Sequence, residues 1–458
     1  MARLVVVSNR VAPIKEGEPP SGGLAAGLLD ALREAGGIWF GWSGEVTESS
    51  PSFVGSPQQV GPISLYTIPL GRADYDGYYR GFANGTLWPT LHYQLSLARF
   101  TWEDYEAWRR VNRVFALCLA PLLSDDDLIW AQDYHLFGLA EALREIGCNQ
   151  RLGLFVHTPF PPPPVLMTVP PHAAVVRALA QFDVIGFQTE GDRVAFDDYL
   201  VRIAEGDIVA HGLTRAYNRL VRTEVYPIGI DVEEIAAQVV APEYQRDAAA
   251  LRSSLRGSSL ILSVDRLDYS KGLRQRFLGF ERFLERHPSR RGGVVMMQIA
   301  PPTREDIETY REIRRELEGE AGRINGRFAE LDWVPLRYLN RGFARPSLMP
   351  MYRAARIGLV TPMRDGMNLV AKEYAAAQDP DDPGVLVLSQ FAGAACELTS
   401  ALLINPYDPD GVAGALEQGL SMSLEERRER HAGMLAVLRE NTLARWRDRF
   451  TADLARAE

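Results

Sequence analysis

The fold is decided by Val360-Thr-Pro-Met-Arg-Asp-Gly-Met-Asn-Leu-Val-Ala-Lys-Glu373. The apolar run 357–360 predicts a buried strand, Arg364 and Asp365 lie in a polar turn, and Asn368 is placed to cap the helix that follows. Backbone N–H groups and the positive end of a helix dipole face such a turn, so an anion or a ribose hydroxyl binds there favourably. We therefore predict a ligand-binding junction of strand and helix. Taken alone, the same pattern also fits an ordinary connecting loop.

Strand-like apolar runs alternate with helical periodicity along the whole chain. The predicted strands are 4–7, 128–131, 152–156, 184–187 and 225–228 in the first half, and 260–264, 294–299, 357–360, 385–388 and 402–404 in the second. This alternation is typical of parallel strands joined by crossover helices. Because 458 residues exceed one ordinary core, we predict an α/β fold of two doubly wound domains.

The predicted first domain spans 1–235 and the second 236–440, and a C-terminal helix at 441–458 is expected to pack back on the first domain. Helices are predicted at 24–34 and at 193–203, and the Pro-rich run 160–164 is predicted to be a rigid loop.

Composition limits the classes of function. With 46% apolar and 24% charged residues, the chain reads as a soluble globular protein, and the absence of a signal-peptide pattern predicts a cytoplasmic location. The net charge of −9 argues against nucleic-acid binding. The expected partners are therefore small molecules, and neither a nucleic acid nor a membrane is expected. Cys118, Cys148 and Cys396 lie far apart, which predicts neither a disulfide framework nor a metal site.

Polar side chains follow the predicted strands of the first half, where parallel sheets bind ligands. Arg10 follows the first strand, Asp133 the second and His157 the third. A lone histidine is more often a hydrogen-bonded core residue than a catalyst. Tyr79 and Trp88 could stack on a sugar, and packing in the core is the alternative for both.

Two cations follow the strand 260–264. Arg266 and Lys271 precede a glycine and a helix, an arrangement that suits a diphosphate whose negative charge grows as it leaves. Exposed ion pairs without a ligand would give the same pattern. Arg304 lies beyond the next strand and adds a third cation.

The order of these pieces resembles that of the trehalose-6-phosphate synthases, which are retaining glycosyltransferases of the GT-B type with two facing Rossmann-like domains and a cleft between them. The resemblance runs nearly end to end. It rests on Val5-Val-Val-Ser-Asn-Arg10, Gly22-Gly23-Leu24, Trp39-Phe-Gly-Trp-Ser43, Asp133-Tyr-His135, His157-Thr-Pro-Phe-Pro161, Gly186-Phe-Gln-Thr189, Glu224-Val-Tyr-Pro-Ile-Gly229, Arg266-Leu-Asp-Tyr-Ser-Lys-Gly272, Asp365-Gly-Met-Asn-Leu-Val-Ala-Lys-Glu373 and Ser389-Gln-Phe-Ala-Gly393.

The resemblance implies transfer of glucose from UDP-glucose to glucose 6-phosphate, giving α,α-trehalose 6-phosphate with neither cofactor nor metal. The acceptor residues it implies are Arg10, Tyr79, Trp88, Asp133 and Arg304. The donor residues it implies are Gly22, Gly23, Arg266, Lys271, Phe343, Asp365, Gly366, Met367, Asn368, Leu369, Val370, Ala371, Lys372 and Glu373. The catalytic residues it implies are His157, Asp133, Arg266, Lys271 and Asp365. A dimer or tetramer is also implied.

The same resemblance implies a front-face reaction, in which the leaving phosphate helps to deprotonate the incoming hydroxyl while Arg266 and Lys271 replace a metal ion. Departures from the family pattern occur at Gln132, Pro164, Asp265 and Cys396. Three alternatives stay open at this point: a transferase for glycerol 3-phosphate or a cyclitol phosphate, a silent sugar-phosphate-binding paralogue, and a nicotinamide dehydrogenase. The last lacks a G-x-G-x-x-G turn after the first strand. The donor nucleotide and the regulation are open as well.

Overall fold

The chain forms two compact units in a computed structural model that describes residues 2–11, 28, 32, 36–304 and 307–457. Unit 1 comprises Met1–Ile228 and Leu443–Glu458, and unit 2 comprises Gly229–Thr442. The division thus falls a few residues before the predicted boundary at 235, because the helix α9 (Val232–Val240) belongs wholly to unit 2.

Unit 1 is built on one sheet, which in the described residues has the strand order β3-β4-β2-β1-β5-β6-β7-β10-β9-β8. Its strands are β1 (Leu4–Arg10), β2 (Gly37–Thr47), β3 (Gln58–Val60), β4 (Ile63–Gly71), β5 (Leu128–Gln132), β6 (Arg151–Phe155), β7 (Val184–Phe187), β8 (Asp207–Ala210), β9 (Leu213–Ala216) and β10 (Arg219–Val225). In sheet order, the strands β4, β2, β1, β5, β6, β7 and β10 run parallel to one another. Antiparallel pairing adds β3 at one edge, and β9 and β8 at the other. Val5, Val6 and Val7 of β1 are fully buried, as expected for a strand covered on both faces.

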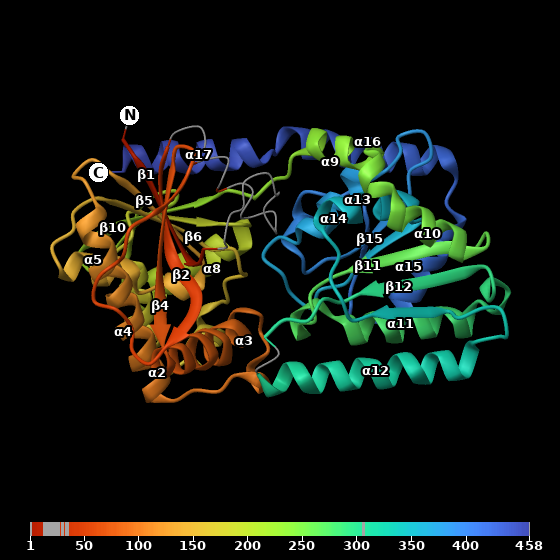
Figure 1. The fold of residues 1–458 in the computed structure, drawn as a ribbon, viewed down its shortest axis with the longest axis horizontal. Helices are drawn as coiled ribbons and strands as arrows, with labels where there is room; N and C mark the ends of the chain where they lie inside the picture. The colour runs from red at the N-terminus through yellow and green to blue at the C-terminus, as the bar shows by residue number, and fades with distance from the viewer. Residues whose placement is uncertain (1, 12–27, 29–31, 33–35, 305–306, 458) are drawn as a thin grey trace. The chain divides into compact units, whose positions relative to one another are not determined.

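The helices of unit 1 are α2 (Arg72–Asp74), the π-helix η1 (Tyr75–Leu87), α3 (Trp88–Leu91), α4 (Trp102–Leu119), α5 (Leu139–Glu145), α6 (Pro163–Leu166), α7 (His172–Leu179), α8 (Glu190–Arg202) and α17 (Leu443–Arg456). Although α17 is last in the chain, it lies beside the sheet of unit 1 (Figure 1). Glycines make room for it: a Cβ at Gly153 would lie 2.8 Å from the Phe450 ring, and one at Gly186 would lie 2.9 Å from it.

Unit 2 is a parallel sheet, with the order β13-β12-β11-β14-β15-β16 in the described residues. Its strands are β11 (Ser259–Val264), β12 (Val294–Ile299), β13 (Leu336–Leu339), β14 (Ile357–Val360), β15 (Val385–Ser389) and β16 (Leu402–Ile404). Its helices are α9, α10 (Gln245–Leu255), α11 (Leu273–Arg286), α12 (Glu308–Phe328), α13 (Arg345–Ala354), α14 (Leu369–Ala377), α15 (Pro409–Ser421) and α16 (Leu424–Glu440). One contacting group is α9, α10, α13 and α14, and another is α11, α12 and α15, so the sheet is covered on both faces (Figure 1).

Each sheet has a topological switch point. In unit 1, β1 lies between β2 and β5, and in unit 2, β11 lies between β12 and β14. The chain progresses in opposite directions on the two sides of such a strand, so the connections diverge and leave a crevice beyond its carboxyl end. Arg10 and Gln132 therefore end adjacent strands at one crevice, and Val264 and Val360 do so at the other.

The structure confirms most of the predicted strands and corrects two predictions. The strand predicted at 225–228 is wrong, because β10 ends at Val225 and the Tyr226 hydroxyl instead donates to Asp453 at 2.8 Å. The run 160–164 is not wholly a loop, since α6 begins at Pro163. Proline is tolerated in a first helical turn, where its missing N–H would have no helical partner. The helix predicted at 24–34 falls largely outside the described residues.

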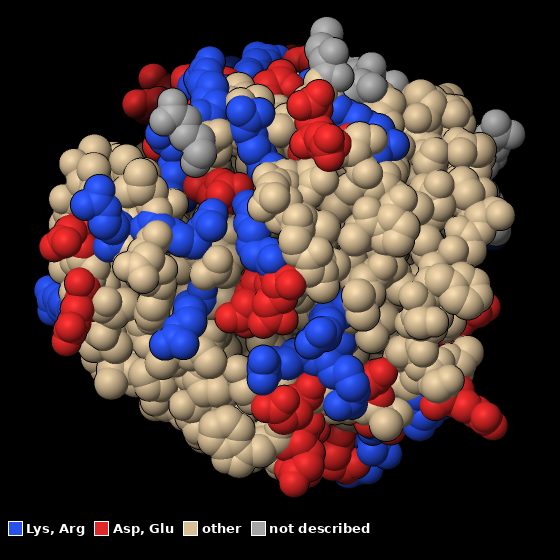
Figure 2. Space-filling view, turned by 90° about the vertical axis from the view of Figure 1, so that its left-hand side faces the viewer, with Lys and Arg blue, Asp and Glu red and all other residues tan. Residues whose placement is uncertain are grey.

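Two surface properties bear on the expected partners. Among the described residues, no helix combines the length and the apolar character needed to cross a membrane. On the face shown in Figure 2, blue and red side chains are interspersed and do not separate into a broad basic patch.

Candidate functional site

Asp133 holds a strained turn at the end of β5. Its backbone has φ 72° and ψ 172°, a combination that only glycine adopts readily and that costs a residue with a side chain about 1–3 kcal/mol. Two contacts with the next strand hold it there: its N–H donates to the Phe155 carbonyl at 2.8 Å, and its Oδ1 accepts from the His157 N–H at 3.2 Å. Strain of this kind clusters at functional sites, and here it fixes a carboxylate at the rim of the sheet.

His157 is held by the residue that precedes Asp133. Its Nε2 lies 2.9 Å from Gln132 Oε1 and, because an amide oxygen only accepts, Nε2 carries the proton. Nδ1 is then the acceptor nitrogen, and within the described residues it has no hydrogen-bond partner. The ring packs against Phe155 and Trp446, with centroids 4.6 and 6.1 Å away. Burial lowers the pKa of His157 from 6.5 to about 3, so the imidazole is neutral at physiological pH.

This pKa predicts a stability that depends on pH. Unfolded His157 takes up a proton below pH 6.5 whereas the folded residue does so only near pH 3, so the stability contribution is complete above 6.5 and is lost as pH falls towards 3. Between pH 7 and pH 5 we expect the free energy of unfolding to fall by up to about 2 kcal/mol more in the parent than in His157→Gln. Denaturant titrations at both pH values measure the difference. Parallel losses in the two proteins would contradict the neutral assignment.

Arg10 and Tyr79 share one aromatic surface beside this turn. The Arg10 guanidinium lies 5.7 Å from the Trp42 ring, and Trp42 contacts Tyr79 with centroids 5.6 Å apart. Tyr79 comes from η1 and stacks on His135 at 5.9 Å. Long π-helices are rare and π-turns are frequent at functional sites, so η1 is a feature that the sequence did not reveal. Gly44 has φ +91°, and a Cβ there would lie 2.7 Å from Arg10.

The predicted stacking of Trp88 on a sugar stays a prediction. The residue is only 6% exposed, and its ring packs between His92 and Tyr134, with centroids 4.0 and 5.5 Å away. Tyr134 in turn donates to Asn84 of η1 at 2.8 Å. Trp88 therefore also packs against the residue that follows Asp133.

In unit 2, Lys271 and Asp365 meet at the switch point. Lys271 Nζ lies 2.5 Å from Asp365 Oδ2, and Asn368 Nδ2 donates to the same oxygen at 3.0 Å. Asn368 also caps α14, because its Oδ1 accepts from the Ala371 N–H at 3.1 Å, as predicted. A cation, a carboxylate and a helix N-terminus thus converge beyond β11 and β14.

Backbone hydrogen bonds hold these loops in register. The loop after β14 bonds to the loop after β11, since the Met363 N–H donates to the Ser270 carbonyl at 2.8 Å. It also bonds to the loop after β15, since the Asp365 N–H donates to Phe391 at 3.1 Å and the Asp365 carbonyl accepts from Gly393 at 3.1 Å. Gly272 is required where the loops cross, because a Cβ there would lie 2.1 Å from the Thr361 carbonyl oxygen.

Arg276 of α11 forms hydrogen bonds with residues at the ends of three neighbouring strands. The sequence analysis did not identify it. Its guanidinium donates to Asp265 at 2.7 Å, to Gln298 at 2.6 Å and to Thr361 at 3.0 Å. The side chain is fully buried at 0% exposure. Asp265 and Thr361 begin the loops that carry Lys271 and Asp365. The signal in the sequence was a lone arginine on the apolar face of the predicted helix after Gly272.

The remaining predicted cations and Phe343 also lie in unit 2. Arg266 is exposed on the loop after β11. Arg304 is a predicted acceptor residue, and it has φ 48°, donates to Asp268 at 3.2 Å and contacts the Tyr310 hydroxyl. Phe343 is half-buried in the loop before α13, under the Arg341 guanidinium at 4.7 Å.

The start of α14 separates the predicted donor residues into two groups. Gly366 and Met367 lie in the turn, and Leu369, Val370 and Ala371 form the first turn of α14. Lys372 and Glu373 follow in α14, and their predicted donor roles stay predictions. Lys372 is 0% exposed and lies 2.5 Å from Glu397, and Glu373 accepts from Arg345 at 2.7 Å. Burial raises the pKa of Glu373 and lowers that of Lys372. Gly22 and Gly23 lie outside the described residues.

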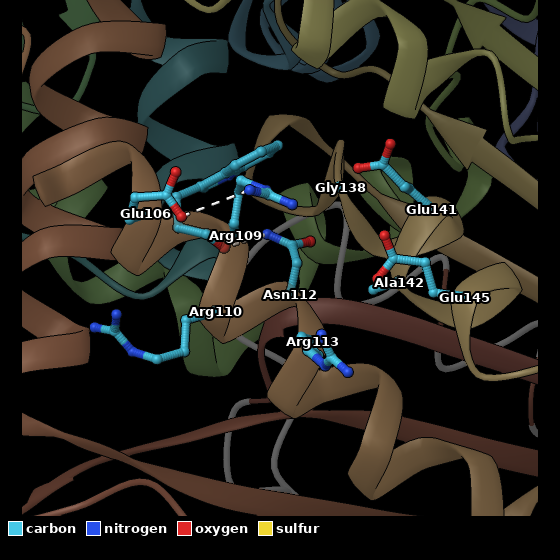
Figure 3. A pocket seen from close by; sticks show the side chains of 10 residues that line it. Glu106, Arg109, Arg110, Asn112, Arg113, Gly138, Glu141, Ala142 and Glu145 are labelled. Carbon is cyan, nitrogen blue, oxygen red and sulfur yellow. Dashed lines mark hydrogen bonds and ion pairs between the residues drawn. The ribbon is translucent and has the colours of Figure 1, made fainter. Parts of the chain in front are cut away.

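A cavity of about 320 Å³ between α4 and α5 is separate from these groups (Figure 3). None of the predicted site residues lines it, although its wall residues Trp108 and Asn112 both donate to the His135 carbonyl, at 3.0 and 3.2 Å. It therefore lies behind the Asp133 turn.

Two Rossmann-like units in one chain, each with charged side chains gathered at its switch point, define the class: the fold is that of the GT-B glycosyltransferases. The sequence pattern of glycosyltransferase family 20 matches residues 5–456, and the chain belongs to this family.

Curated relatives and solved structures resemble the chain over nearly its full length. It is 50% identical to "Trehalose-6-phosphate synthase" from Enterobacter sp. (strain 638), with 100% of this chain and 96% of the relative covered. An alpha,alpha-trehalose-phosphate synthase (UDP-forming) from Burkholderia xenovorans, solved in complex with glucose-6-phosphate, is 52% identical with a TM-score of 0.95 and coverage of 99% and 100%. "Trehalose-6-phosphate from E. coli bound with UDP-2-fluoro glucose" is 49% identical with a TM-score of 0.94 and coverage of 99% for both chains. The predicted family and fold class are thereby confirmed.

Proposed function

We propose that this glycosyltransferase moves glucose from UDP-glucose to the anomeric hydroxyl of glucose 6-phosphate, giving α,α-trehalose 6-phosphate and UDP. The observation that carries the proposal is the full-length similarity, at 49% and 52% identity, to proteins solved with a UDP-glucose analogue and with glucose-6-phosphate. The site geometry supports it, since the Lys271–Asp365 contact suits a diphosphate sugar and the Asp133 carboxylate suits sugar hydroxyls. Unit 1 would bind the acceptor with Arg10, Tyr79 and Asp133, and unit 2 would bind the donor.

The proposed chemistry retains the anomeric configuration. The bond from the anomeric carbon of glucose to the β-phosphate oxygen breaks, a bond from that carbon to the acceptor oxygen forms on the same face, and the acceptor proton passes to the leaving phosphate. Lys271 and Arg266 would stabilise the charge that grows on the diphosphate, which is the role of a metal ion in other transferases. His157 enters as a neutral group whose Nδ1 would accept a hydrogen bond from a substrate hydroxyl.

The first experiment incubates the purified chain with UDP-glucose and glucose 6-phosphate in EDTA, with GDP-glucose and ADP-glucose as rival donors. We expect trehalose 6-phosphate in which both anomeric centres have the α configuration, which NMR coupling constants identify, and undiminished activity in EDTA. A β linkage would refute retention, and activity that returned only with added magnesium would refute metal independence. Absence of product from every donor, in a folded chain that binds UDP, would instead favour another phosphorylated acceptor or a silent paralogue.

A further inference from the structure

The cavity between α4 and α5 contains a buried acceptor without a partner. Asn112 is 1% exposed, and its Nδ2 uses both hydrogens, on the Trp108 carbonyl at 3.0 Å and on the His135 carbonyl at 3.2 Å. These two bonds fix the orientation of the amide. Its Oδ1 is left without a hydrogen-bond partner in the described part of the chain. A buried acceptor in this state is unfavourable, and a donor group of a guest molecule would satisfy it.

The shape of the cavity is set by a glycine. A Cβ at Gly138 would lie 3.0 Å from the Trp108 ring and 3.3 Å from Asn112 Cγ, so a larger residue would narrow the space between them. The volume of about 320 Å³ falls within the range of small-molecule sites, about 300–1,000 Å³. Figure 3 shows Asn112 between the charged side chains of α4 and those of α5.

The charges around Asn112 cancel. Three glutamates and three arginines line the cavity: Glu106, Glu141, Glu145, Arg109, Arg110 and Arg113. A guest with a net charge gains little from such a set, whereas hydroxyl groups can donate to the carboxylates and to Asn112 and accept from the guanidinium groups. Glu141 is half-buried in this set, and burial, and then Glu145, raise the pKa of its carboxyl.

We propose that this cavity is a second binding site, for a neutral polyhydroxylated molecule of monosaccharide to disaccharide size, linked through Asn112 to the turn that carries Asp133. The link is the His135 carbonyl, which accepts from both Asn112 and Trp108. His135 also stacks on Tyr79, so a guest that draws Asn112 towards itself shifts the support of both residues. By linkage, ligands at the two places change each other's affinity.

The test is calorimetric titration of the intact chain with α,α-trehalose, D-glucose and D-glucitol, each to about 50 mM, which detects dissociation constants near and above 1 mM. Each titration is repeated in saturating glucose 6-phosphate, which occupies the proposed acceptor site. Glu141→Ala removes a cavity carboxylate on α5, and Glu103→Ala on α4 is the control, because Glu103 is exposed and does not line the cavity.

We expect at least one probe to bind once per chain and to remain bound in glucose 6-phosphate. Its dissociation constant should rise about tenfold in Glu141→Ala and be unchanged in Glu103→Ala, because a hydrogen bond to a charged group is worth about one such factor. Three results would overturn the proposal: no saturable binding of any probe, binding abolished by glucose 6-phosphate, or equal affinity in Glu141→Ala and the parent. None of these readouts depends on catalysis, so failure of this proposal and failure of the proposed reaction can be distinguished.

Discussion

Replacement of Lys271 by alanine is expected to lower kcat about 10²- to 10³-fold, while KM changes much less. The Lys271 ammonium lies 2.5 Å from Asp365 at the switch point of unit 2, where the leaving diphosphate of the proposed reaction would develop its charge. A cation there is worth most in the transition state, because that is when the phosphate charge is greatest. Initial rates at varied UDP-glucose and glucose 6-phosphate separate the two constants.

Arg282→Ala is the matched control for Lys271→Ala. Arg282 lies on α11, just beyond the loop of Lys271, and it is an exposed cation paired with Asp410 at 2.6 Å. Its loss should leave kcat within about twofold of the parent, because exposed ion pairs contribute about 0–1 kcal/mol. If Lys271→Ala kept kcat within the same range, or lowered activity only by raising KM, Lys271 would be a binding residue and not a stabiliser of the leaving group.

Arg276→Met is expected to destabilise unit 2 by about 3–5 kcal/mol. The guanidinium is fully buried and donates to Asp265, Gln298 and Thr361, so its removal leaves a buried carboxylate and two acceptors without their donor. Methionine keeps most of the volume, which limits the effect of a cavity. Denaturant unfolding, followed by a probe in unit 2, measures the change. Activity should fall as well, because the loops of Lys271 and Asp365 start at the residues that Arg276 joins.

A double variant distinguishes this charge effect from a general packing defect. In Arg276→Met with Asp265→Asn, the unpaired buried charge is gone, so part of the lost stability should return. If a packing defect caused the loss, the loss of stability in the double variant would equal or exceed the sum of the losses in the two single variants. A loss below about 1 kcal/mol in Arg276→Met alone would show that the network is not a stabilising element of unit 2.

Sequence patterns were enough to predict those features of the fold that depend on residues close together in the chain. The buried parallel strands read as short apolar runs, and Asn368 was identified as a cap because an Asx side chain before an apolar helix has one common use. The same reasoning placed Asp133 and His157 after β5 and β6. It failed at β2, where Gly37, Gly41 and Gly44 weaken the strand pattern.

The site needed information that the sequence does not carry locally. Trp88, Lys372 and Glu373 are predicted ligand residues, and the structure adds that each also makes contacts within the fold. These contacts come from residues distant in sequence, so the local pattern does not show them. Arg276 was missed for the same reason: its three partners come from three separate strands, and only their assembly makes a buried arginine favourable. The functional roles assigned to His157, Arg266 and Arg304 stay predictions.

The sequence by itself determined that this chain has two α/β units, since strand periodicity, turn chemistry and helix caps are set by residues within a few positions of one another. The glycosyltransferase class came from the resemblance of its ordered motifs to a known family. Only the tertiary structure decided which side chains meet. The Lys271–Asp365 contact, the Gln132–His157 pair and the strained Asp133 join residues from different strands. Their geometry depends on strand order and register, which follow from packing the whole sheet and not from any single segment.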